Sequence, residues 1–143
     1  MASLPIHWIE VRAYVHATEE EGRVSKAIET VAAGPDVARE VFEGHFGNPI
    51  VRLSRRLETV DGIRATWERW RSAGALSEVS KDLPGRIDED GILHVRFDKQ
   101  AAYGGRFALG REGDAIDVRI KLKVYRVKED EILRVARSLL EVA

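Results

Sequence analysis

The stretch that decides the fold is Ile116-Asp117-Val118-Arg119-Ile120-Lys121-Leu122-Lys123-Val124-Tyr125. Apolar and polar residues alternate strictly along it, which is typical of a β-strand with one buried face. The opposite face would then carry Arg119, Lys121, Lys123 and Tyr125. If neighbouring strands repeat this pattern, one surface of the sheet gathers cations and aromatic rings, a combination that suits phosphates and stacked bases.

The overall charge does not by itself indicate a partner. The chain has 143 residues, 23 Lys plus Arg and 24 Asp plus Glu, for a formal net charge of -1. A binding surface for a polyanion must therefore come from where the charges lie. The length and the 44% of hydrophobic residues predict one domain, over residues 1–143, with a sizeable core.

Several classes of site are excluded or disfavoured by residue type. The chain has no cysteine, which excludes disulfides, thiolate zinc sites and cysteine nucleophiles. Its four histidines are scattered, and the glycines from 104 to 113 lack the pattern of a nucleotide-binding loop, so we expect neither a metal nor a cofactor. Without a run of about 20 apolar residues or a leader, we expect a cytoplasmic protein that does not enter membranes.

Alternation also predicts strands over Ile6–His16 and Ile92–Asp98, and a hairpin within residues 39–57 around Gly44–Pro49. Arg55 breaks the alternation of the second arm, which suggests a bulge. Helical spacing of apolar residues predicts helices after Thr18, over residues 61–73 and from about Glu129. The order predicts an α+β fold: a mainly antiparallel sheet with helices packed on one face.

The uncovered face of such a sheet would be basic. It would carry Arg12, Arg52, Arg56, Arg96, Arg119, Lys121 and Lys123 against Glu10, Asp98 and Asp117, with Trp8, Tyr14, His16, His94 and Tyr125 beside them. Arginines and lysines would hold phosphates, and the aromatic rings would stack on bases. The alternative is a solvated face with cross-strand ion pairs, for example between Glu10 and an arginine.

Two further segments concentrate polar chemistry. The turn within 44–50 offers glycine-flanked amides with His45 and Asn48, and the segment 98–103 offers Lys99, Gln100 and Tyr103. Glycine-flanked amides can approach a phosphate closely, and an amide side chain can donate to and accept from a base edge. Either segment could equally serve to fix a loop.

Four motifs together resemble an archaeal family of RNA-binding proteins described as predicted exosome subunits. They are His16-Ala17-Thr18-Glu19, Gly44-His45-Phe46-Gly47-Asn48-Pro49-Ile50, Asp98-Lys99-Gln100-Ala101-Ala102-Tyr103 and Asp114-Ala115-Ile116, and they occur in the family's order. The chain departs from the family at Asp114-Ala115, where a pair of acidic residues is common. The resemblance implies a fold like that of the large-subunit ribosomal protein that binds central-protuberance RNA, and a role near exosome or ribosomal RNA metabolism.

These patterns favour a non-catalytic RNA-binding protein, with single-stranded or structured RNA as its partner and exosome or ribosomal components as further partners. The expected RNA-binding residues are Arg12, Tyr14, His16, His45, Asn48, Arg52, Arg56, Arg96, Lys99, Gln100, Tyr103, Arg119, Lys121, Lys123 and Tyr125. A protein–protein adaptor in an RNA-processing assembly is the alternative hypothesis. A nuclease that uses His45 with Asp98 ranks last, because no activated nucleophile or metal cluster is evident.

Overall fold

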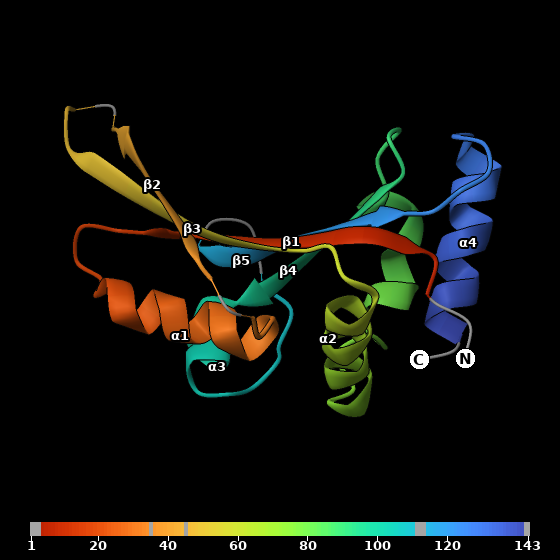
Figure 1. Ribbon diagram of the computed structural model, residues 1–143, viewed down its shortest axis with the longest axis horizontal. Helices are drawn as coiled ribbons and strands as arrows, with labels where there is room; N and C mark the ends of the chain where they lie inside the picture. The colour runs from red at the N-terminus through yellow and green to blue at the C-terminus, as the bar shows by residue number, and fades with distance from the viewer. Residues whose placement is uncertain (1–3, 35, 45, 111–113, 142–143) are drawn as a thin grey trace.

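The computed structural model describes residues 4–34, 36–44, 46–110 and 114–141, and they form a five-stranded sheet with helices (Figure 1). The strands are β1 (Ile6–Val15), β2 (Ala38–Glu43), β3 (Pro49–Leu57), β4 (Ile92–Asp98) and β5 (Ala115–Leu122). Their order in the sheet is β2-β3-β1-β5-β4, and every neighbouring pair is antiparallel. The predicted α+β class and the hairpin of β2 and β3 are confirmed.

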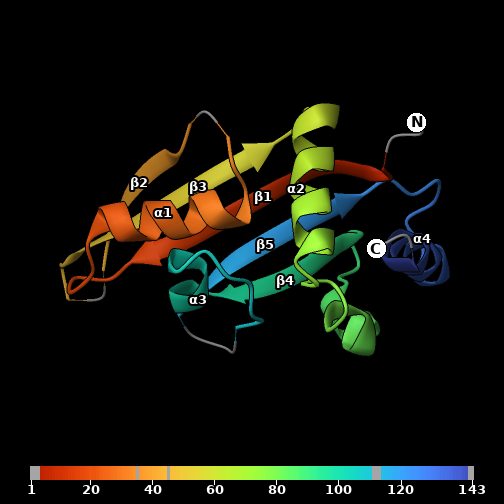
Figure 2. The same cartoon turned by 90° about the horizontal axis from the view of Figure 1, so that it is seen from below.

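Helices cover one face of this sheet. They are α1 (Glu21–Val31), α2 (Val60–Ser72), the 3-10 helix η1 (Val79–Arg86), the short α3 (Lys99–Tyr103) and α4 (Glu129–Glu141). Figures 1 and 2 show α1, α2 and α3 on the same side of the sheet, with α4 standing at the end where β5 finishes. No described helix lies across the other side of the strands, although α4 rises past it at that end (Figure 1).

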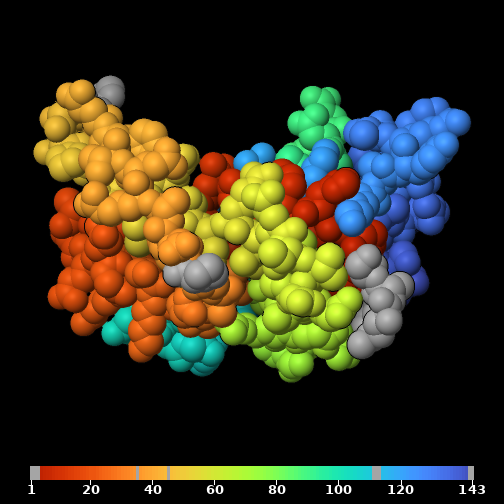
Figure 3. Space-filling view, in the orientation of Figure 1, coloured from red at the N-terminus to blue at the C-terminus, as the bar shows by residue number. Residues whose placement is uncertain are grey.

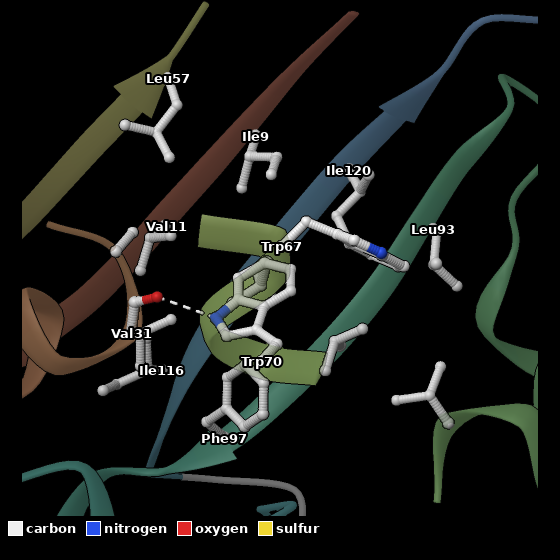
Figure 4. Packing of buried hydrophobic residues seen from close by; sticks show 14 of the residues in the cluster. Ile9, Val11, Val31, Leu57, Trp67, Trp70, Leu93, Phe97, Ile116 and Ile120 are labelled. Carbon is white, nitrogen blue, oxygen red and sulfur yellow. Dashed lines mark hydrogen bonds between the residues drawn. The ribbon is translucent and has the colours of Figure 1, made fainter. Parts of the chain in front are cut away.

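The core lies between the strands and these helices because the apolar half of each alternating strand points there (Figure 4). Trp67 and Trp70 of α2 are buried against it, with their ring centroids 5.9 Å apart. The indole nitrogen of Trp70 donates to the carbonyl of Val31 at 2.8 Å, which joins α2 to the end of α1. Phe97 of β4 lies 5.7 Å from Trp70, so aromatic contacts connect helix and sheet.

Arg55 keeps the alternation of β3, where the sequence analysis predicted a break. It pairs regularly with Val11, so the predicted bulge is wrong; the irregularity of the sheet lies in β1 between Ile6 and Trp8. Arg55 points to the core side and is 5% exposed. It is tolerated there because its guanidinium donates to Glu29 and to the carbonyl of Ala32, both at 2.6 Å.

Two of the predicted helices match closely. α2 begins at Val60, where Thr59 caps it by accepting from the amide of Gly62, and α4 begins at Glu129. No helix among the described residues has the length and apolarity to cross a bilayer.

Candidate nucleic-acid interface

The uncovered side of the sheet is the floor of a broad hollow. Figure 3 shows this hollow between two raised parts, the β2–β3 hairpin on the left and, on the right, the turn before β4 with the segment after β5. We call the side chains on this floor the open face. It comprises Trp8, Glu10, Arg12, Tyr14, Arg52, Ser54, Arg56, His94, Arg96, Asp117, Arg119 and Lys121.

Glu10 organises the centre of the open face. The register places it between Arg56 of β3 and Arg119 of β5. Its carboxylate lies 3.3 Å from the Arg119 guanidinium, 3.7 Å from that of Arg56 and 4.0 Å from that of Arg12. Arg56 also lies 3.3 Å from Glu58. Three guanidinium groups therefore meet two carboxylates, and this part of the floor keeps an excess of positive charge.

Trp8 lies beside this group and is only partly exposed. The guanidinium carbon of Arg56 is 4.2 Å from the centroid of its ring, and that of Arg119 is 5.8 Å away. Both distances allow cation–π attraction. The two guanidinium groups thus contact the indole ring, and this part of the floor combines an aromatic surface with positive charge.

The remaining arginines of the open face are paired with carboxylates. Arg96 lies 3.1 Å from Asp117, and Arg52 lies 2.8 Å from Glu40 of β2. Hydrogen bonds to Glu40 and then to Tyr14 raise the pKa of Arg52 above its ordinary value. The floor is therefore basic, and the cross-strand ion pairs of the alternative interpretation are present on it as well.

The far end of the predicted basic strand does not stay on this face. β5 ends at Leu122, and Lys123 lines a small hollow with Leu4 and Ile6, on the core side. Tyr125 lies beyond the strand and is 90% exposed. The amine of Lys121 is hydrogen-bonded to the carbonyl of Asp90. The row of basic side chains stops here because β1 is irregular between Ile6 and Trp8 and because β5 ends at Leu122.

Lys99 is placed differently from its predicted position at the RNA surface. It is 3% exposed, and its amine donates to the carbonyl of Tyr14 at 2.8 Å and to the carboxylate of Glu19 at 3.1 Å. It also contacts Asp114. We call Lys99, Glu19, Asp114 and His16 the sheet-end cluster. It holds the end of β1, the approach to α1 and the start of β5 together.

The surroundings of Asp114 in this cluster favour its ionised form. Burial acts to raise its pKa, but the hydrogen bond and charge of Lys99, aided by His16 3.1 Å away, outweigh burial and hold the pKa of Asp114 below its usual value. One group among the described residues could hold a metal ion, namely His16, Glu19 and Asp114. Their possible ligand atoms lie within 4.8 Å of one another. The Lys99 ammonium already supplies a cation to two of them.

A hollow of about 440 Å³ lies next to the sheet-end cluster, and we call it the end hollow. Its described lining residues come from the end of β1, the hairpin turn and the start of β5, namely Tyr14, Val15, His16, Ala17, Gly44, Phe46, Asn48, Pro49, Ile50, Asp114, Ala115 and Asp117. The turn needs glycine at position 44, where a Cβ atom would lie 2.7 Å from the carbonyl oxygen of Asn48. The predicted His45 lies outside the described residues.

Gln100 and Tyr103 lie on the helix side of the sheet end, apart from the open face. They line a separate hollow of about 310 Å³ with residues of α1. Lys26 and Arg23 of α1 lie 4.9 Å and 5.4 Å from the Tyr103 ring centroid. Asp98 caps α3 by accepting from the amide of Ala101 at 2.9 Å.

The structure therefore brings together most of the predicted arginines with Tyr14, and places His16 and Asn48 at one end of them. The sequence analysis placed Trp8 on this face, as the structure does, but left it out of the list of expected RNA-binding residues. It also missed Phe46 and Ile50, because the strand pattern does not say how a hairpin turn folds back beside the end of another strand.

Comparisons with known proteins show the family of the chain. Residues 8–122 match the model of the RNA-binding family. The chain is 35% identical to RNA-binding protein PAB1135 of Pyrococcus abyssi, over 96% of both chains, and 32% identical to the uncharacterized protein MJ0213 of Methanocaldococcus jannaschii, over 86% and 89%. The crystal structure of protein AF2318 from Archaeoglobus fulgidus superposes with a TM-score of 0.85 at 35% identity, covering 94% of this chain and 99% of that one. The chain belongs to this RNA-binding family.

Proposed function

We propose that this protein binds RNA without catalysing a reaction, and that the RNA lies along the open face. The observation that carries the proposal is the group of Trp8, Arg12, Arg56 and Arg119 held around Glu10 on the floor of the hollow. Guanidinium groups bind phosphates, and a partly exposed indole can stack on a base. The family match and the name of the Pyrococcus abyssi relative support the same conclusion.

Unpaired RNA is the ligand that this surface suits best. Stacking on Trp8 requires a base that is not already paired and stacked in a duplex. The arginines come from three neighbouring strands, so a flexible backbone can cross the floor and meet them in turn. Single-stranded segments and the loops of structured RNA both meet this requirement.

A matched pair of variants tests the location. Arg56→Gln with Arg119→Gln removes two charges from the open face, and Arg71→Gln with Arg137→Gln removes two from exposed positions on α2 and α4. Fluorescence anisotropy with labelled single-stranded RNA should show weaker binding, by about tenfold or more, only for the first pair. Equal losses in both pairs would show that binding follows net charge and not this surface.

A second part of the proposal concerns the process in which the protein takes part. We infer from the sequence resemblance a role near exosome or ribosomal RNA processing, and a fold shared with the ribosomal protein that binds central-protuberance RNA. Purification of the tagged protein from archaeal cells should recover exosome or ribosomal components, and recovery should fall after nuclease treatment if RNA connects them.

The adaptor function is the second candidate, and the β2–β3 hairpin favours it. β2 is an edge strand whose residues are all exposed, including Val41 at 54% and Phe42 at 40%. Exposed edges and apolar side chains are common in protein contacts. Partners that remain bound after nuclease treatment, and that no longer bind the Val41→Ser variant, would favour the adaptor.

A further inference from the structure

The end hollow continues the open face, and its walls suit a base. Tyr14 belongs to both, since its side chain ends the row of β1 residues on the floor and also lines the hollow. Figure 1 shows the hairpin and the end of β1 at the same end of the sheet. An RNA strand that follows the arginines therefore reaches the end hollow, whose volume of about 440 Å³ is in the range of small-ligand sites.

The apolar part of the hollow is unusually exposed for side chains of its kind. Phe46 is 87% exposed, Tyr14 39% and Ile50 38%. Such side chains in one concave place are typical of a binding site. Two of them are aromatic, so an unstacked base has flat surfaces to lie against.

The polar part of the hollow presents acceptors. Lys99 and His16 both contact Oδ1 of Asp114, and Arg96 contacts Oδ1 of Asp117. Among the described residues, the Oδ2 atoms of these two carboxylates have no hydrogen-bond partner. An ionised carboxylate only accepts hydrogen bonds, so these two groups favour a ligand that donates. Carboxylates also repel phosphate, which keeps the backbone on the arginine floor.

Guanine is the base whose edge fits these acceptors. It has two adjacent donors, the N1–H and the N2 amino group, whereas adenine and cytosine each offer one amino group beside an acceptor. Uracil offers a single N–H between two carbonyl oxygens, which the carboxylates would repel. We propose that the end hollow binds one unpaired guanine of the RNA, with Asp114 accepting from its donors and Phe46 packing on its ring. This inference rests on the RNA binding proposed above.

Oligonucleotides that differ at one base test the proposal. Heptauridylates with a central guanine, adenine, cytosine, inosine or 2-aminopurine are titrated with the wild-type protein and compared with plain heptauridylate. Guanine should improve binding by about tenfold, the lower part of the range for a good base contact. Inosine lacks the N2 amine and 2-aminopurine lacks the N1–H, so both should lose most of that gain.

Variants then locate the effect. Phe46→Ala and Asp114→Asn should each reduce the guanine-to-uridine affinity ratio toward one while binding to plain heptauridylate persists. Phe42→Ala is the control, because Phe42 is exposed on the same hairpin but lies against Arg52. Phe46→Ala keeps the test valid if Asp114→Asn destabilises the sheet-end cluster.

The outcomes separate the two proposals. Tight binding of all heptamers with no preference for guanine overturns the guanine site and leaves RNA binding in place. A guanine preference that survives Phe46→Ala and Asp114→Asn places the selection elsewhere and also overturns it. If no heptamer binds even at low salt, the proposed function itself fails.

Discussion

At the scale of single residues, Trp8 has the clearest part in the proposed interface. It is the tryptophan that lies on the open face, whereas Trp67 and Trp70 are buried in the core. Trp8→Ala should weaken binding of single-stranded RNA by about tenfold or more, since stacking on an aromatic ring contributes roughly 1–3 kcal/mol per base. Anisotropy titration measures this.

The control for that substitution is Tyr125→Ala. Tyr125 is 90% exposed but lies beyond β5, away from the sheet floor. Its removal should leave RNA affinity unchanged within about twofold. A larger loss with Tyr125→Ala than with Trp8→Ala would move the binding surface to the segment after β5.

Lys99 should matter for stability rather than for direct contact with RNA. Lys99→Met leaves Glu19 and Asp114 without their buried cation, and we expect a loss of about 3 kcal/mol in the free energy of unfolding, at the low end for a broken buried pair. Lys81→Met breaks the exposed pair of Lys81 with Glu78 and should cost less than about 0.5 kcal/mol. Urea unfolding compares them, and equal costs would contradict the structural role of Lys99.

At the scale of elements, two carboxylates that lie before strands β4 and β5 make stability depend on pH. Burial acts to raise the pKa of Asp88, but hydrogen bonds from His94 and from the amides of Ile92 and Asp90 outweigh it and hold the pKa low. Asp114 in the sheet-end cluster also has a lowered pKa. Each ionised group favours the folded state above the ordinary aspartate pKa of about 4, and this contribution is lost as pH falls through the lowered pKa.

Acid unfolding tests this link between the two carboxylates and stability. Asp88→Asn should lower the free energy of unfolding at pH 5, and its difference from the wild type should shrink between about pH 4 and pH 2, where the wild-type carboxylate takes up its proton. Urea titrations at several pH values measure the difference. A difference that stays constant down to pH 2 would show that ionised Asp88 does not stabilise the turn before β4.

The strands and long helices could be predicted from the sequence because one buried face per element imposes a clear period. Arg55 was misjudged because alternation alone does not show that a charged group can be satisfied on the core side by Glu29 and a carbonyl at the end of α1. Lys123 and Tyr125 were misplaced because a strand end and an irregularity in the partner strand leave no signal in the period. The sheet-end cluster joins residues far apart in the chain, so only the fold brings them together.

At the scale of the whole molecule, a chain with net charge -1 can bind a polyanion because its charges are separated in space. Arginines gather on the open face, and the acidic starts of α1 and α4 lie elsewhere. Binding should therefore weaken linearly with the logarithm of salt concentration. Replacing Arg12 and Arg119 by Gln should reduce the slope by about 0.7 for each phosphate that the variant no longer neutralises. A slope unchanged by both substitutions would exclude these two arginines from phosphate binding.

The central claim is that RNA lies on the uncovered face of the sheet, and the three tryptophans report on it directly. The protein labelled with 5-fluorotryptophan should give three ¹⁹F resonances, assigned by single substitutions. Titration with single-stranded RNA should shift the Trp8 signal saturably and leave those of Trp67 and Trp70 nearly unmoved. RNA that binds by anisotropy but leaves Trp8 unmoved would contradict the account.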